Sequence, residues 1–98
     1  MSRIELAPEI QDDFERILEH PRRYRATDMS SRIDDIMRAI DALEGNPLIG
    51  RPVGADLREL VIGRRARGYL ALYRYVAKID TLFVLAIRGQ KEAGYAKA

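Results

Sequence analysis

The sequence predicts an α+β domain with the element order β-α-α-β-β-β, in which a helical hairpin packs on one face of an antiparallel sheet. Two segments in the first half carry apolar residues at helical spacing, and three runs in the second half have the composition of strands. Short connections join the three runs, as in an antiparallel meander. The 98 residues suffice for one domain and not for two, so residues 1–98 are expected to fold as one unit.

The first two elements are a strand and a helix. In SRIELA (2–7), Ile4 and Leu6 alternate with polar neighbours, which predicts a short strand with these two side chains facing inward. Pro8 suits the first turn of a helix. The helical spacing of apolar residues continues to His20, before a proline that stops the helix.

A second helix is expected to begin near Asp28 or Ser30, because either residue can cap its N-terminus. Gly45 is expected to close this helix. Residues 46–56 contain two prolines and two glycines, which predicts a loop. The apolar stripe of the second helix consists of Ile33, Ile36, Met37, Ile40 and Leu43.

The three strands of the meander are predicted at LRELVI (57–62), GYLALYRYV (68–76) and TLFVLAI (81–87). The last run is apolar on both faces, so it should be the most buried strand. It is also the longest apolar run, and it is far too short to span a membrane. The N-terminus lacks the apolar core of a secretory signal, and we therefore expect a cytosolic protein.

The middle strand of the meander alternates in character. Tyr69, Ala71, Tyr73 and Tyr75 share one face, while Arg74 lies among apolar residues on the other. Tyrosines beside arginines can stack on bases, but tyrosines are also common half-buried core residues of strands, and we expect the core role for Tyr73 and Tyr75. Arg74 is interpreted as a snorkelling edge residue or as a deliberately placed cation.

Charge is distributed unevenly along the chain. Residues 1–50 carry 7 Lys and Arg against 11 Asp and Glu, a net −4, and residues 51–98 carry 10 against 4, a net +6. Arg64, Arg65 and Arg67 form the most basic stretch, in the turn between the first two strands of the meander. They suit contact with an anionic partner, although a solvated tip is the plain alternative.

The C-terminal segment holds a second cluster, Arg88, Lys91 and Tyr95. Cations at a strand end can bind a phosphate, and a tyrosine beside them can act as an acid or base. A solubilising tail is the alternative. There is no cysteine, the single histidine is His20, and no metal-ligand or phosphate-loop pattern occurs, so neither a metal nor a cofactor is expected.

Two segments, RELVIGRRARGYLALYRYV (58–76) and FVLAIRGQKEAGY (83–95), resemble the RelE/ParE family of bacterial toxins from type II toxin–antitoxin systems. IELAPEIQDDFERI (4–17) is similar to the family's opening, where the first strand gives way to a helix. The resemblance covers nearly the whole chain and implies the family's fold. The family divides into two activities on that one fold.

Members similar to RelE cut messenger RNA in the ribosomal A site, which requires a base, an acid and cations beside the phosphate. They carry lysines and an arginine on the middle strands, an arginine after the last strand and a tyrosine near the C-terminus. By resemblance, Lys91 takes the place of the late arginine and Tyr95 that of the tyrosine. LRELVI (57–62) has no lysine, however, and Leu70 occupies the position of the middle-strand arginine.

Members similar to ParE lack that set and poison DNA gyrase, so the missing cations favour a ParE-like gyrase inhibitor. The alternatives are a ribosome-dependent mRNA endonuclease and an inactive interaction module of the same fold. Each toxin activity implies a cognate antitoxin in a hetero-oligomer, and an acidic antitoxin would suit the basic half. The residues expected to contact target or antitoxin are Arg64, Arg65, Arg67, Arg74 and Arg88.

Overall fold

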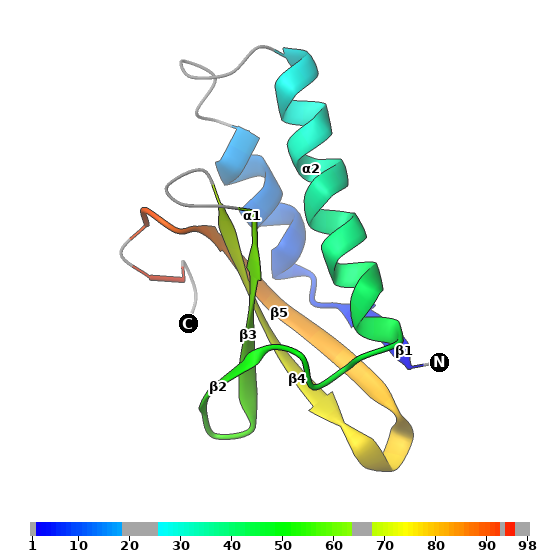
Figure 1. The fold of residues 1–98 in the computed structure, drawn as a ribbon. Coiled ribbons are helices and arrows are strands. Elements are labelled where there is room, and N and C mark those ends of the chain that lie inside the picture. The colour runs from blue at the N-terminus through cyan, green and yellow to red at the C-terminus, as the bar shows by residue number, and fades with distance from the viewer. Residues whose placement is uncertain (1, 19–25, 64–67, 93, 96–98) are drawn as a thin grey trace.

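A computed structural model describes residues 2–18, 26–63, 68–92 and 94–95 of the chain. One sheet of five strands has the order β1-β5-β4-β3-β2, and both helices lie on the same side of it (Figure 1). The elements are β1 (Arg3–Leu6), α1 (Glu9–Leu18), α2 (Ala26–Asp41), the 3₁₀ turn η2 (Ala42–Glu44), β2 (Arg51–Gly54), β3 (Leu57–Ile62), β4 (Tyr69–Val76), the 3₁₀ turn η4 (Ala77–Ile79) and β5 (Thr81–Gly89).

The predicted α+β class and the helical hairpin on one face are confirmed, whereas the element order, β-α-α-β-β-β-β, has one strand more than predicted, and the sheet differs from the prediction at its two edges. The sheet is mixed instead of wholly antiparallel, because β1 pairs with β5 in parallel, with Ile4 opposite Leu82. Such a pair needs a long connection, and all the other elements supply it. The predicted loop 46–56 contains β2, which pairs with β3 despite Pro52, since proline is tolerated on an edge strand.

Smaller differences concern where elements begin and which residues they bury. In the described part of the chain, α2 begins at Ala26, ahead of the expected caps Asp28 and Ser30. Gly45 does follow the helical segment, but with φ −91 instead of a left-handed conformation. Leu6 lies opposite the buried Val84 and so faces the helices as expected, but as the last residue of an edge strand it is 42% exposed.

The core fills the space between the helices and one face of the sheet. Tyr69, Ala71 and Tyr73 of β4 are buried there, and Tyr75 packs against their cluster, so the predicted tyrosine face is confirmed as a core face. The largest fully buried side chains are Tyr73, Ile36, Ile40, Leu43, Leu82, Ile87 and Val84. β5 contributes three of these, in agreement with its expected burial.

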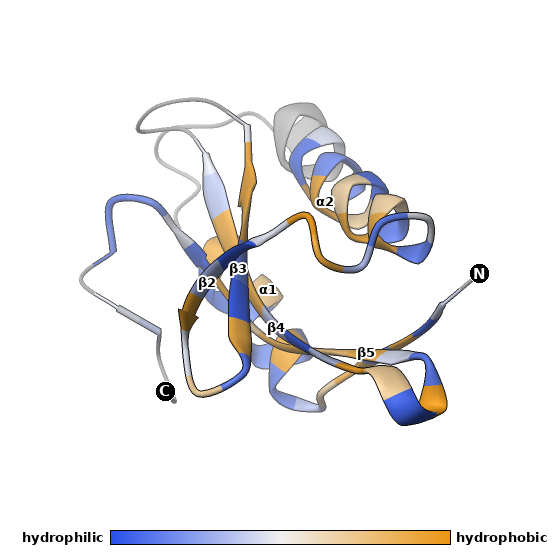
Figure 2. Ribbon diagram, turned by 60° about the horizontal axis from the view of Figure 1, so that its bottom comes forward, coloured by the Kyte–Doolittle hydropathy of each residue, from blue (hydrophilic) through white to orange (hydrophobic). Residues whose placement is uncertain are grey.

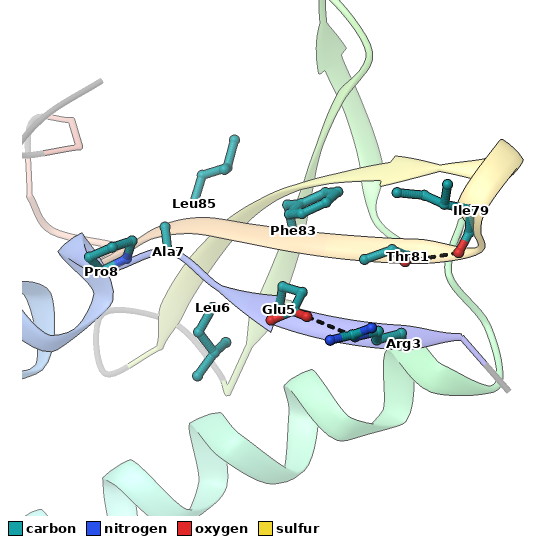
Figure 3. Close-up of a pocket in the computed structure, with 9 residues that line it drawn as sticks. All are labelled: Arg3, Glu5, Leu6, Ala7, Pro8, Ile79, Thr81, Phe83 and Leu85. Atoms are coloured by element: carbon teal, nitrogen blue, oxygen red, sulfur yellow. Dashed lines mark hydrogen bonds and ion pairs between the residues drawn. The ribbon is translucent and has the colours of Figure 1, made fainter.

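The other face of the sheet, called the open face below, carries no helix. In the register of the strands, Glu59 lies opposite Leu72, and Arg74 opposite Phe83. Residues directly opposite each other point to the same face, so these four share the open face. Figure 3 shows Phe83 rising from the side of β5 opposite α2. No helix in the described part of the chain is long and apolar enough to cross a membrane.

Candidate functional site

The structure describes four of the predicted site residues, Arg74, Arg88, Lys91 and Tyr95. Arg64, Arg65 and Arg67 lie outside the described residues. The glycines on either side of them are described, and Gly63 has φ +78, a conformation that favours glycine. A Cβ on Gly68 would lie 2.8 Å from the backbone oxygen of Ile62, which cannot move aside as a side chain can, so glycine is favoured on both sides of residues 64–67.

The structure brings two of the predicted residues, Arg88 and Tyr95, to a buried carboxylate on the open face. The hydroxyl of Tyr95 donates to Oε2 of Glu59 over 2.7 Å. Oε1 of the same carboxylate accepts from Nε of Arg51 over 3.0 Å and also from Nη2. The guanidinium carbon of Arg88 lies 5.1 Å from the centre of the Tyr95 ring. We call these four residues the Glu59 cluster.

Burial and charge shift both acidic groups of the Glu59 cluster. Burial alone would raise the pKa of Glu59, but hydrogen bonds from Tyr95 and Arg51 outweigh it, and the pKa is lowered. The pKa of Tyr95 is raised, by burial first and then by its hydrogen bond to Glu59, although Arg88 opposes the shift. Glu59 therefore stays an anion and Tyr95 a neutral donor over the physiological range.

The guanidinium of Arg88 is occupied by the chain around it. Nη1 donates to the backbone oxygen of Glu92 over 2.7 Å and more weakly to that of Gly89 over 3.3 Å. Nε is buried and has no hydrogen-bond partner among the described residues. Arg88 therefore closes the turn after β5 and compensates nearby carboxylates, which lowers the pKa of both Glu59 and Glu92.

A second polar network, the α1 clamp, fixes the end of β5 to α1. It consists of Asp13, Arg16 and Glu92. The carboxylate of Asp13 is buried and accepts from the backbone N–H of Ile87 over 2.9 Å and from Nη1 of Arg16 over 2.7 Å. Arg16 donates to the backbone oxygen of Ile87 over 2.9 Å and through Nε to Glu92 over 2.7 Å.

Glu92 completes the clamp from the turn after β5. Its Oε2 accepts from the backbone N–H of Gly89 over 2.6 Å. Burial would raise the pKa of Glu92, but the hydrogen bonds from Arg16 and from Gly89 lower it. The clamp thus holds residues 89–92 against α1, ahead of Tyr95, whose hydroxyl reaches Glu59.

The two remaining predicted residues are exposed and lie away from this carboxylate. Lys91 is exposed in the turn after β5, and Arg74 is exposed on β4. Neither forms an ion pair with a described carboxylate. β4 is an interior strand of the sheet, so Arg74 is not the edge residue of its first interpretation, and its exposed side chain pairs with no described carboxylate.

A hollow of about 500 Å³ lies beside β1 and β5 on the open face (Figure 3). Phe83 and Leu85 give it an apolar wall, and the Arg3–Glu5 ion pair, 2.7 Å between Nε and Oε1, lies along its side. The hydroxyl of Thr81 is already bonded to the backbone oxygen of Ile79 over 2.9 Å. The hollow thus offers apolar surface, with its polar groups paired.

Sequence reasoning missed the acidic members of both networks, Glu59, Asp13 and Glu92. The adjacent pair Asp12 and Asp13 does diverge on α1 as helical geometry requires, with Asp12 exposed and Asp13 buried. The sequence did hold one signal for Asp13, because a carboxylate at an inward-facing position of a helix needs a buried hydrogen-bond donor. Across the described residues, no three His, Asp or Glu side chains gather as metal ligands.

One comparison with known proteins identifies the family, and another finds solved structures of the same fold. The sequence profile described as the ParE toxin of the type II toxin–antitoxin system, parDE, matches residues 4–94. A chain of the intact E. coli RelBE toxin–antitoxin complex is similar at 15% identity with a TM-score of 0.61, over 94% of this chain and 99% of that one. The isolated E. coli RelE toxin is similar at 12% identity with a TM-score of 0.63, over 95% and 88%.

The solution structure of HP0892, a conserved hypothetical protein from Helicobacter pylori, is similar at 15% identity with a TM-score of 0.50, over 92% of this chain and 96% of that one. A search of curated proteins found no match. The solved structures share the fold at these low identities, and the profile covers every strand and both helices. The chain therefore belongs to the ParE toxin family of type II toxin–antitoxin systems.

Proposed function

We propose that this toxin inhibits DNA gyrase by binding it, in the cytoplasm, and that a cognate antitoxin neutralises it. The observation that carries the proposal is the hydrogen bond from Tyr95 to Glu59. This hydrogen bond engages the hydroxyl of Tyr95, the residue that by resemblance takes the place of the C-terminal tyrosine of a RelE-like nuclease. Membership of the ParE toxin family supports the same choice of target.

Proton transfer at Tyr95 is disfavoured by its surroundings. A general acid or base works best when its pKa lies near the working pH, and the pKa of Tyr95 is shifted away from neutrality. The phenol proton is already donated to a carboxylate that stays ionised. The hydrogen bond therefore suits a structural tie better than an acid–base catalyst.

Phosphate binding at this place is disfavoured as well. A cleavage reaction on RNA needs net positive charge beside the scissile phosphate. Here β3 contributes the anion Glu59, and Leu70 of the central strand β4 is apolar and buried. Arg51 and Arg88 largely offset carboxylates of the chain itself. A binding inhibitor needs no such charge at this point, only a surface.

The proposed contact residues are cations of the basic half of the chain. Arg74, which is exposed on the open face, and Arg64, Arg65 and Arg67, which precede β4 in the sequence, are the cations that we assign to contact with the gyrase–DNA complex or with the antitoxin. We assign to Arg88 a structural role, in which it holds the C-terminal segment. An antitoxin partner is supported by the similarity to a chain of a toxin–antitoxin complex.

Purified protein freed of any antitoxin tests the proposal in two parallel assays. DNA supercoiling by gyrase should fail and linear DNA should accumulate, while messages on translating ribosomes stay whole. Tyr95→Phe should leave the gyrase effect intact, and Tyr75→Phe is the matched control because its hydroxyl binds Asp80 at the surface. Messages cut in the A site, with cutting lost in Tyr95→Phe, would establish the ribonuclease instead.

A further inference from the structure

A groove of about 700 Å³ lies between the connection that leads into β2, the β2–β3 turn and the end of β4. It is separate from the Glu59 cluster, since none of those four residues lines it. Its apolar lining includes Leu48, Leu57 and Val76. Its charged lining consists of the cations Arg58, Arg74 and Lys78 and one carboxylate, Asp56.

The charge of this groove is uncompensated. Three cations against one carboxylate leave it net positive, and two of the cations, Arg74 and Lys78, are exposed. Among the described residues, neither of these two forms an ion pair. A groove of one sign attracts a partner of the opposite sign and speeds its approach.

The apolar rim of the groove is held rigid although it is exposed. Leu48 is 54% exposed, on a connection whose backbone forms four hydrogen bonds with the side chains of Tyr73 and Arg58. The buried hydroxyl of Tyr73 donates to the backbone oxygen of Pro47 and accepts from the N–H of Gly50, both over 2.8 Å. Nη1 of Arg58 donates to the backbone oxygens of Leu48 and Gly50 over 3.1 and 2.8 Å.

A large apolar side chain on a fixed backbone costs little entropy when a partner covers it. Figure 2 shows a hydrophobic stretch in the middle of this connection, between the end of α2 and β2. We propose that the groove docks an amphipathic segment of a partner protein, one that carries aliphatic side chains among Asp and Glu residues. The aliphatic side chains would cover Leu48 and Leu57, and the carboxylates would meet Arg74 and Lys78.

A protein segment fits this groove better than a nucleic acid does. Single-stranded nucleic acids are held by aromatic rings on which bases stack, in addition to cations. The one ring in the lining is Tyr75, and its hydroxyl is bonded to Asp80 over 2.6 Å. The rest of its apolar lining is aliphatic. The proposal is independent of whether the toxin acts on gyrase or on the ribosome.

Synthetic peptides of about 16 residues test the proposal on the whole chain, since that length allows helix formation. The probe has leucines at helical spacing and glutamates elsewhere, and a second peptide of the same composition has its leucines spread around the helix. Binding is followed by fluorescence anisotropy and by methyl NMR. We expect the first peptide to bind and to shift the methyl signals of Leu48, and the second to bind at least tenfold more weakly.

Two pairs of variants locate the binding. Leu48→Ser should weaken the first peptide about tenfold, as loss of a central apolar contact does. Ile49→Ser is its matched control, because Ile49 is 59% exposed on the same connection but does not line the groove. Arg74→Ala should weaken binding several-fold, whereas Arg38→Ala, exposed on α2, should not. Thermal unfolding of each variant checks that it is folded.

Three results would overturn the proposal. If both peptides bind equally well, they are attracted by charge alone. If Leu48→Ser and Ile49→Ser lose the same affinity for the first peptide, the contact lies outside the groove. If a single-stranded oligonucleotide displaces the first peptide, and if Arg74→Ala also weakens binding of the oligonucleotide, the groove is assigned to nucleic acid instead. Arg74→Glu provides a second charge variant if the effect of Arg74→Ala is small.

Discussion

The hydroxyl of Tyr95 lies 2.7 Å from Oε2 of Glu59, and this contact joins the last described residue of the chain to the middle of the sheet. Glu59 is 7% exposed, although it is a charged residue on the face that no helix covers. Its burial depends on the C-terminal segment that crosses it. The contact therefore links the fold of that segment to the surface that a target or an antitoxin would meet.

Removal of the Tyr95 hydroxyl should cost stability and leave a binding activity in place. A hydrogen bond to a charged group contributes about 1.5–3 kcal/mol, and Tyr95→Phe removes one from a buried carboxylate. Arg51 still neutralises Glu59, which places the expected loss near the lower end of this range. Urea unfolding measures the change in the free energy of unfolding.

Tyr75→Phe is the control for this prediction, because its partner Asp80 is exposed and the loss should stay below about 0.5 kcal/mol. If the two variants lose equal stability, the Tyr95–Glu59 contact does not hold the C-terminal segment. Inhibition of gyrase by Tyr95→Phe is expected to remain within about threefold of the wild type, a difference of about 0.7 kcal/mol.

Loss of Arg16 should loosen the α1 clamp and with it the C-terminal segment. Arg16→Met removes the cation and the donors that serve Asp13 and Glu92, and leaves the buried carboxylate of Asp13 with the backbone N–H of Ile87. Breaking a buried pair costs about 3–5 kcal/mol, and the partial exposure of Arg16 and Glu92 reduces the expected cost to about 2–3 kcal/mol.

Two measurements check this prediction. Urea unfolding should report the loss of stability, and backbone hydrogen exchange of residues 89–92 should speed up more than that of α2. Arg38→Ala, an exposed arginine of α2, is the control and should change stability by less than about 0.5 kcal/mol. Unchanged exchange at residues 89–92 would show that the clamp does not set the path of this segment.

Much of the fold could be predicted because it follows from local periodicity. The helical stripe that includes Ile36 and Ile40, and the alternation of Tyr69, Ala71 and Tyr73, both specify one buried face without knowledge of any partner element. β2 was not predicted, because an edge strand with Pro52 has the composition of a loop. Its pairing depends on β3, which lies beyond the turn.

The candidate site was predicted only in part because its contacts join distant segments. Arg88 was selected as a cation at the end of a strand, and Tyr95 from its residue type beside that cation and from the family resemblance. Glu59 occupies a polar position in an alternating strand, which normally predicts exposure to solvent. Its burial arises from a tyrosine 36 residues later in the chain. Asp13 accepts a hydrogen bond from the N–H of Ile87, which lies 74 residues away in the sequence, and no local pattern predicts this contact.

Acid should destabilise the protein through the carboxylates of both networks. The pKa values of Glu59 and Glu92 are lowered from the ordinary 4.5, so the unfolded chain binds protons first as the pH falls. The stability that these groups contribute is complete above about pH 4.5 and is lost as the pH falls through their lower folded values. The free energy of unfolding should therefore decrease from pH 5 to pH 3.

Glu92→Gln tests the assignment of this acid response, because glutamine does not titrate. Its stability should decrease less than that of the wild type between pH 5 and pH 3 in urea unfolding. Glu15→Gln, which replaces an exposed carboxylate of α1, should keep the wild-type slope. If Glu92→Gln also keeps the full slope, the acid response arises elsewhere in the chain.

Gly50 should be the least replaceable glycine of the connection that displays Leu48. A Cβ at Gly50 would lie 2.6 Å from Cε1 of Tyr73, whose ring is fully buried and cannot yield, so Gly50→Ala is expected to cost about 1–3 kcal/mol as an overpacked core does. Gly45→Ala is the matched control, because a Cβ there meets nothing within 4 Å and its φ of −91 suits any residue. We expect Gly45→Ala to be neutral or stabilising by up to about 1 kcal/mol in urea unfolding. Equal stability of the two variants would mean that the hydroxyl of Tyr73 does not fix this connection, and the rigid display of Leu48 beside the groove would lose its physical basis.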